Sequence, residues 1–149
     1  MLGDRGDTEA IDGAVAAIET VYHVGAAMRG GPKAFEAGTV WGTRNVVESC
    51  RRHGAQRLVY VSSMSVYDHA GRDPAQTLTE ASALEPHPQS RGAYTQTKLT
   101  AERQVLDAIN AHGLPAVILR PGQIFGPGAE RARDVIGLGV GESPGRIDE

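Results

Sequence analysis

Tyr94 and Lys98 are the two residues whose side-chain types and spacing best suit acid–base chemistry in this sequence. Residues four apart on a helix lie on the same face, about one turn from each other. An ammonium group at that distance lowers the pKa of a phenol, which is otherwise about 10. Such a phenol can exchange a proton with a substrate hydroxyl near neutral pH. The alternative is a chance pair on a solvated helix face. The residues around the pair must show which of the two interpretations holds.

Ser63 is the third candidate, because it ends a nearly continuous apolar run over residues 57–63. Its hydroxyl can hydrogen-bond the same substrate oxygen as Tyr94 and orient it. Oxidation of an alcohol needs a base and a hydride acceptor together. The natural partner reaction is therefore hydride transfer to a nicotinamide.

Helical and strand patterns alternate along the chain and must position these side chains. Apolar spacing predicts a helix after Asp7, a second over 33–53 that buries Trp41, and a third over 93–111 that stops at Gly113. Short β-branched runs predict strands at 20–24, 57–63 and 116–120. This order implies parallel strands joined by right-handed crossovers, and hence three strands of an open α/β sheet.

Ligands of open α/β sheets lie at the carboxyl ends of the strands. Three such ends carry small or hydroxylated residues here: Gly25-Ala26-Ala27, Ser62-Ser63 and Pro121-Gly122. A polar segment over residues 67–91 follows the second strand, and loops of this length are usually functional. Its carboxylates, among them Glu85, are expected on a solvated face with at most a minor substrate role. Arg120 is expected to pair locally.

Composition excludes several classes of function. The chain has 149 residues, 40% of them hydrophobic, which suits about one domain. Its net charge of −3 and its lack of a basic patch argue against nucleic-acid or membrane partners. The single cysteine, Cys50, favours a reducing cytoplasmic location and an inert buried thiol. The histidines show no metal-ligand spacing, so no metal site is expected, and His23 is expected in the core.

Five motifs appear in an order that resembles one known family. They resemble the extended short-chain dehydrogenases/reductases, the NAD-dependent epimerase/dehydratase family, over roughly residues 3–130. The motifs are Tyr22-His23-Val24-Gly25-Ala26-Ala27, Gly42-Thr43-Arg44-Asn45-Val46, Val59-Tyr60-Val61-Ser62-Ser63-Met64-Ser65-Val66-Tyr67, Tyr94-Thr95-Gln96-Thr97-Lys98 and Leu119-Arg120-Pro121-Gly122-Gln123-Ile124-Phe125-Gly126-Pro127-Gly128. The resemblance implies a partial Rossmann-like doubly wound parallel sheet.

The resemblance also implies a role for each matching residue. Tyr94 corresponds to the catalytic acid–base, Lys98 to the lysine that binds the nicotinamide ribose and tunes the tyrosine, and Ser63 to the catalytic Ser/Thr. The implied cofactor is NAD or NADP. Its further contacts would be Asp4 and Arg5 near the adenine, Val24, Gly25, Ala26, Ala27 and Met28 along ribose and phosphates, Thr39, and Pro121 and Gly122 beside the nicotinamide.

Two departures from the family pattern set further expectations. Thr39 stands where the family has an asparagine that helps to position the cofactor region. No glycine-rich G-x-G-x-x-G turn is present after an opening strand. The chain is therefore expected to be an internal fragment, with residues 1–130 forming part of an NAD(P)-binding domain and 131–149 a flexible or incomplete tail. The strand near Val21 would then have an exposed edge.

Several functions stay open at this point. The preferred one is an epimerase/dehydratase-like oxidoreductase acting on a nucleotide-sugar or a similar small molecule, homodimeric in its full-length form. A 3β-hydroxysteroid-dehydrogenase-like reductase is nearly as plausible. A non-catalytic dinucleotide-binding or scaffold protein, or an inactive truncated product, is the alternative from another class.

The absence of the glycine-rich turn generates a binding prediction. Without a helix N-terminus to hold the pyrophosphate, residues 1–149 alone should bind NAD weakly or not at all. Titration calorimetry should give no measurable heat at micromolar concentrations. A dissociation constant in the micromolar range would contradict this expectation.

Overall fold

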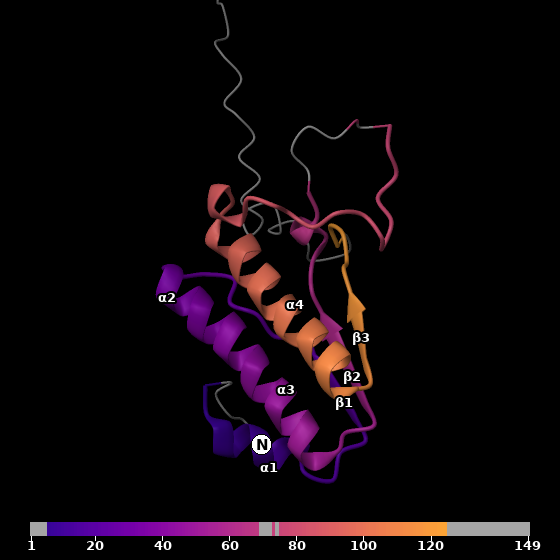
Figure 1. The fold of residues 1–149 in the computed structure, drawn as a ribbon. Coiled ribbons are helices and arrows are strands. Elements are labelled where there is room, and N and C mark those ends of the chain that lie inside the picture. The colour runs from indigo at the N-terminus through magenta and orange to yellow at the C-terminus, as the bar shows by residue number, and fades with distance from the viewer. Residues whose placement is uncertain (1–5, 69–72, 74, 125–149) are drawn as a thin grey trace, which may run out of the picture.

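The computed structural model describes residues 6–68, 73 and 75–124. In this part of the chain, a three-stranded parallel sheet has the order β1-β2-β3, and helices pack against it (Figure 1). The strands are β1 (Thr20–His23), β2 (Arg57–Val61) and β3 (Ala116–Leu119). The predicted α/β class and its three parallel strands are thus confirmed. The candidate cofactor residues Asp4 and Arg5 and the predicted tail over 131–149 lie outside the described residues.

The register of the sheet separates two faces of β2. Tyr22 pairs with Val59 and Val59 with Val117, so these three side chains share one face. Leu58 and Tyr60 point to the other face and are completely buried. Among the described strands, β1 occupies an edge beside β2, as expected for the strand near Val21.

The predicted first and third helices are confirmed with small shifts at their ends. Helix α1 (Thr8–Val15) begins after Asp7, whose carboxylate accepts a hydrogen bond from the Ala10 N–H at 3.1 Å. Helix α4 (Ala93–His112) ends at Gly113, which adopts the left-handed conformation that glycine tolerates best. No helix in the described ranges is both long and apolar enough to span a membrane.

The predicted second helix is not regular, because a π-helical segment interrupts it. A single turn, α2 (Pro32–Phe35), leads into the π-helical segment Glu36–Trp41, and α3 (Gly42–His53) continues from there. A π-helical turn inserts an extra residue relative to α-helical geometry and rotates the residues that precede it. Trp41 consequently lies 48% exposed under the Arg44 guanidinium rather than in the core, so its predicted burial is wrong. Two short 3₁₀ helices, Met64–Val66 and Pro88–Ser90, complete the described elements.

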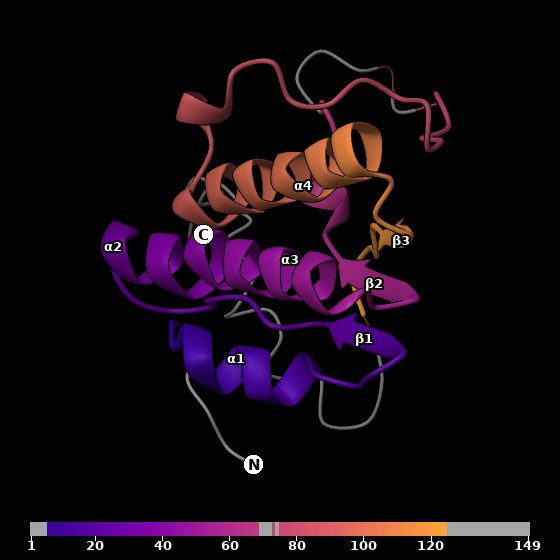
Figure 2. The same cartoon turned by 60° about the horizontal axis from the view of Figure 1, so that its bottom comes forward.

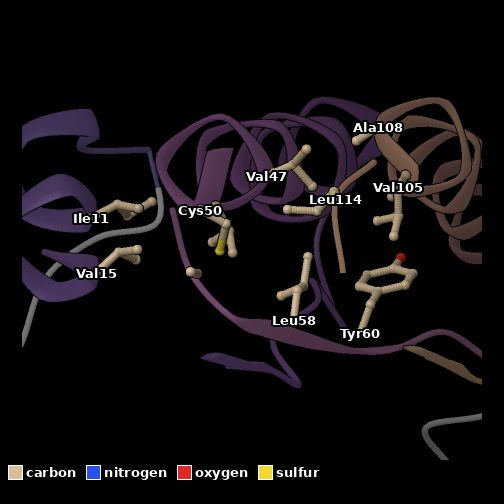
Figure 3. Close-up of a cluster of buried hydrophobic side chains, with 12 residues drawn as sticks. Ile11, Val15, Val47, Cys50, Leu58, Tyr60, Val105, Ala108 and Leu114 are labelled. Atoms are coloured by element: carbon tan, nitrogen blue, oxygen red, sulfur yellow. The ribbon is translucent and has the colours of Figure 1, made fainter. Parts of the chain in front are cut away.

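One apolar cluster joins the helices to the sheet (Figure 3). Leu58 and Tyr60 rise from β2 toward the helices, with Val105 of α4 above the Tyr60 ring. Cys50 of α3 is completely buried in this cluster, and burial raises the pKa of its thiol to about 11. The expectation of a buried cysteine is therefore confirmed, and a raised thiol pKa is what an unreactive cysteine would have.

The described helices all lie on one side of the sheet, as Figures 1 and 2 show together. The opposite face is apolar and open to solvent: Tyr22 is 71% exposed and Val117 49% exposed. The apolar character of β2 suggested a strand covered on both faces, whereas the described elements cover one.

A buried ion pair fixes the end of β3 to α4. Glu102 is completely buried, and its carboxylate accepts hydrogen bonds from Arg120, the shortest at 2.7 Å. Arg120 also donates to the Tyr67 hydroxyl at 2.9 Å and packs over the Tyr67 ring. The predicted local pairing of Arg120 is confirmed, and the pair connects α4 with the segments that follow β2 and β3.

Removal of one partner from this ion pair should be costly. Arg120→Met leaves the Glu102 carboxylate buried without its counter-charge, so we expect a loss of about 3 kcal/mol in the free energy of unfolding. Arg44→Met removes the partner of Glu48 in an exposed ion pair of α3 and should lose less than about 1 kcal/mol. Urea denaturation measures both values. Equal losses would show that the Arg120–Glu102 pair contributes no more to the free energy of unfolding than an exposed ion pair.

Candidate active site

The carboxyl ends of β2 and β3 lie side by side and continue into paired loops. The Ser62 N–H donates to the Leu119 carbonyl at 2.7 Å, and the Met64 N–H donates to the Pro121 carbonyl at 2.9 Å. Gly122 lies against Met64: a Cβ atom on Gly122 would lie 3.3 Å from the Met64 sulfur. The segments carrying Ser63 and Pro121-Gly122 therefore form one edge, as the strand pattern predicted.

Lys98 reaches this edge from α4. Its Nζ donates a hydrogen bond to the Val61 carbonyl at 2.8 Å, and the residue is only 2% exposed. A buried ammonium is thereby held at the end of β2, two residues before Ser63. Because charges are rarely buried without fixed partners, this position is a specific feature of the fold.

Tyr94 precedes Lys98 by one turn, at the start of α4, and is half-buried. Ser63 is half-buried as well, and its Oγ accepts a hydrogen bond from the Ser65 N–H at 3.2 Å. That bond leaves the Ser63 hydroxyl proton available to donate. The structure thus places Lys98 beside the end of β2, which leads to Ser63, and places Tyr94 on the helix turn next to Lys98.

Thr39 is tied to the segment that follows β1. Its Oγ1 accepts a hydrogen bond from the Ala27 N–H at 3.0 Å, and the residue is 1% exposed. The threonine hydroxyl therefore contacts the backbone at the position where the family has an asparagine. The π-helical geometry of residues 36–41 sets which side chains of this segment face Ala27.

Gly38 contributes to the same contact and was missed by the sequence-based prediction. A Cβ atom on Gly38 would lie 3.1 Å from the Ala27 Cβ, closer than most side chains tolerate. A larger residue here would require the segment that follows β1 to shift by a few tenths of an ångström. A glycine within an apolar helical pattern was the available signal for it.

The remaining predicted cofactor residues form an open rim. Gly25, Ala26, Ala27 and Pro121 are half-buried, whereas Val24, Met28 and Gly122 are exposed. Small side chains after the carboxyl ends of β1 and β3, with the Lys98 ammonium fixed at the end of β2, suit the riboses and phosphates of a dinucleotide. The donor set present therefore fits the cofactor that the resemblance implied.

His23 and a surface hollow at the far end of α4 lie outside the candidate site. His23 is buried, and its Nε2 lies 2.9 Å from the Thr43 Oγ1, which confirms the prediction of a satisfied core histidine. A surface hollow lined in part by Arg51, Gly54 and His112 lies where α3 and α4 end. Tyr94 and Lys98 lie at the opposite end of α4.

The loop after β2 is anchored by a carboxylate that we expected in solvent. Glu85 is 3% exposed and accepts hydrogen bonds from the His87 N–H at 3.0 Å and from Arg91 at 2.7 Å. These interactions hold the pKa of the Glu85 carboxyl below its usual value, and the hydrogen bond from the His87 N–H has the largest effect. The expected solvated face is wrong for Glu85, which instead fixes the loop just before α4.

A parallel α/β sheet with a buried lysine and a tyrosine at its carboxyl edge defines the class of this protein, a Rossmann-like dehydrogenase fold. The profile of the NAD dependent epimerase/dehydratase family matches residues 1–140. The chain therefore belongs to this family, and the resemblance inferred from the five motifs is confirmed.

Two curated enzymes illustrate the range of its relatives. The 2-alkyl-3-oxoalkanoate reductase of Stenotrophomonas maltophilia (strain K279a) is 37% identical over 158 residues, covering 99% of this chain and 47% of that enzyme. A 3 beta-hydroxysteroid dehydrogenase/Delta 5→4-isomerase of Mycobacterium tuberculosis (strain ATCC 25618 / H37Rv) is 32% identical over 141 residues, covering 86% of this chain and 36% of that enzyme. The chain spans less than half the length of either relative.

A solved structure supports the fold and the cofactor of the family. A double mutant of DesIV, a dTDP-glucose 4,6-dehydratase from Streptomyces venezuelae crystallised with NAD and DAU bound, matches with a TM-score of 0.73 and 25% sequence identity. The match covers 84% of this chain and 38% of that one. The expected nicotinamide dinucleotide is confirmed at the level of the family, as NAD.

The lowered pKa of Glu85 generates a pH-dependent prediction. A carboxyl whose pKa is lower in the folded state stabilises the fold above its unfolded pKa, and this stability is lost as the pH falls through the folded pKa. Between about pH 5 and pH 3, the free energy of unfolding should fall more steeply for the wild type than for Glu85→Gln. Arg91→Gln should give an intermediate slope because the His87 N–H remains. Identical slopes in urea denaturation at each pH would contradict this role of Glu85.

Proposed function

We propose that residues 1–130 form part of the NAD-binding domain of an oxidoreductase and carry its proton-transfer machinery. The observation that supports this most directly is the buried Lys98 ammonium, fixed by the Val61 carbonyl one helical turn from Tyr94. A non-catalytic dinucleotide-binding or scaffold protein needs no proton relay, so the presence of Ser63, Tyr94 and Lys98 together argues against that alternative. The cost of burying the ammonium is explained if it acts on a neighbouring proton-transfer group.

Each residue of the site has a distinct role in this proposal. Tyr94 takes the proton from a substrate hydroxyl during oxidation and returns it to the carbonyl oxygen during reduction. The positive charge of Lys98 favours the negative charge that develops on the Tyr94 oxygen during proton transfer, and the Ser63 hydroxyl donates a hydrogen bond to the substrate oxygen. Bound NAD supplies the hydride acceptor.

The rim residues would hold the cofactor beside this machinery. Lys98 would reach the nicotinamide ribose, and Pro121 and Gly122 would lie beside the nicotinamide. The segment Val24–Met28, held by Thr39 through Ala27, would follow the ribose and phosphates. Asp4 and Arg5 would contact the adenine end.

The substrate class that we favour is an apolar compound with a hydroxyl or carbonyl at its third carbon. The relatives named above act, by their names, on 3-oxoalkanoates and on 3-hydroxysteroids. The reductase match covers nearly the whole chain at 37% identity. A nucleotide-sugar is the second candidate, because a dTDP-glucose dehydratase shares the fold at 25% identity.

Two expectations about the protein in the cell belong to the same proposal. A cytoplasmic location is supported by the presence of a single cysteine, Cys50, which is buried. A homodimer of the full-length protein rests on analogy with the family, where two helices per subunit, the second corresponding to α4, form the interface.

The proton-transfer role predicts the effect of removing one oxygen atom. In the whole protein, Tyr94→Phe should lower the rate of NAD-linked oxidation of a 3-hydroxy substrate by at least about 100-fold, because the general acid–base is lost. NAD affinity should change little, since the ring remains. Stopped-flow absorbance at 340 nm measures NADH formation, and fluorescence titration measures NAD binding.

Tyr22→Phe is the matched control, because Tyr22 is 71% exposed on the open face of the sheet. It removes the same hydroxyl group outside the site and should leave turnover unchanged. Unchanged turnover in Tyr94→Phe would eliminate the catalytic proposal and favour the non-catalytic alternative.

A further inference from the structure

Two consecutive residues of β2 hold the Lys98 ammonium. The Val61 carbonyl accepts its hydrogen bond at 2.8 Å, and the ammonium lies over the Tyr60 ring, 5.4 Å from the ring centroid. Figure 3 shows the Tyr60 side chain rising from β2 toward the helix layer, which is the layer that carries Lys98. The ammonium is therefore held at the sheet by a carbonyl oxygen and an aromatic face.

Burial makes the aromatic contact consequential. Tyr60 is completely buried and Lys98 is 2% exposed, so little water solvates the charge. An aromatic face attracts a cation through its negative quadrupole, and the attraction strengthens when both groups are desolvated. An aliphatic side chain of similar size at position 60 would leave the ammonium with less compensation.

Tyr60 itself is a neutral group in this environment. Burial, and then the negative charge of Glu102, raises the pKa of the Tyr60 phenol above its ordinary value. The other groups around it are Tyr94 on α4, Thr43 on α3 and the His23 ring on β1, whose centroid lies 5.5 Å away. Arg120 pairs with Glu102. Tyr60 therefore offers the ammonium a ring face rather than a second base.

We propose that Tyr60 is a positioning residue for Lys98, which keeps the ammonium at the end of β2, one turn from Tyr94. This inference rests on the proposed function, because its consequence is the stabilisation of the Tyr94 phenolate. If the ammonium loses the ring face, it is no longer held beside the helix turn that carries Tyr94. Alcohol oxidation then loses the positive charge that supports proton transfer to Tyr94, so the acidic limb of the pH–rate profile moves to higher pH.

A series of replacements at position 60 tests the ring face separately from side-chain volume. In the whole protein, Tyr60→Leu should move the acidic limb of kcat/KM upward by about one pH unit, which is about a tenfold loss below the limb. Tyr60→Phe keeps the ring face and should retain the wild-type limb. Replacement of Tyr60 by pentafluorophenylalanine keeps the ring shape but reverses its quadrupole, so it should move the acidic limb upward as Tyr60→Leu does. This variant tests the ring face independently if Tyr60→Leu folds poorly.

Leu58→Ala is the matched control, because Leu58 is a completely buried neighbour on the same face of β2. It should lower Tm while leaving the acidic limb in place. If the pentafluorophenylalanine and phenylalanine variants share one limb, Tyr60 is only a packing residue and the inference is overturned.

A second measurement separates this inference from the proposed function. The ring current of Tyr60 should shift the ¹H–¹³C signal of the Lys98 ε-methylene upfield, and Tyr60→Leu should abolish that shift. This readout requires no turnover. If the wild type shows the ring-current shift but no NAD-linked activity, only the proposed function is refuted. If the Lys98 signal is unshifted in an active wild type, only the positioning role is refuted.

Discussion

The hydrogen bond between the Lys98 ammonium and the Val61 carbonyl is the constraint on which the site depends. It connects the first turns of α4 to the carboxyl end of the central strand β2, and it buries a positive charge at that junction. Because a charge in this position is unfavourable without fixed partners, the fold must hold both ends of the bond rigidly. The helix face that carries Tyr94 is thereby fixed relative to the strand that leads to Ser63.

The surrounding contacts can be understood as supports of this one junction. One turn beyond Lys98, Glu102 binds Arg120 and thereby fixes the end of β3 to α4. Before the helix, Glu85 fixes the loop through Arg91 and the His87 N–H. Buried polar groups therefore restrain α4 on both sides of Lys98, while the apolar cluster around Leu58 and Val105 supplies the bulk of the packing.

The sequence alone was sufficient for the fold class and the strands, because these depend on local patterns, and the proposed site residues rest on patterns of the same kind. Apolar runs mark β1, β2 and β3, Asp7 and Gly113 mark helix ends, and the four-residue spacing marks the face of Tyr94 and Lys98. The failures concern properties that depend on tertiary contacts. The burial of Glu85 depends on Arg91 and a backbone N–H, and the exposure of Trp41 and the role of Gly38 depend on a π-helical turn that has no distinct periodicity in the sequence.

That π-helical turn also constrains how this part of the chain can change. Deletion of one residue between positions 36 and 41 would restore regular α-helical geometry, but it would turn the preceding part of the helix by roughly 100° relative to α3. Gly38 and Thr39 would then no longer face the Ala27 backbone. Insertions and deletions here are therefore not neutral changes in helix length. The number of residues in this segment sets the rotation of the preceding turn relative to α3, so the contact with Ala27 requires that number to stay the same.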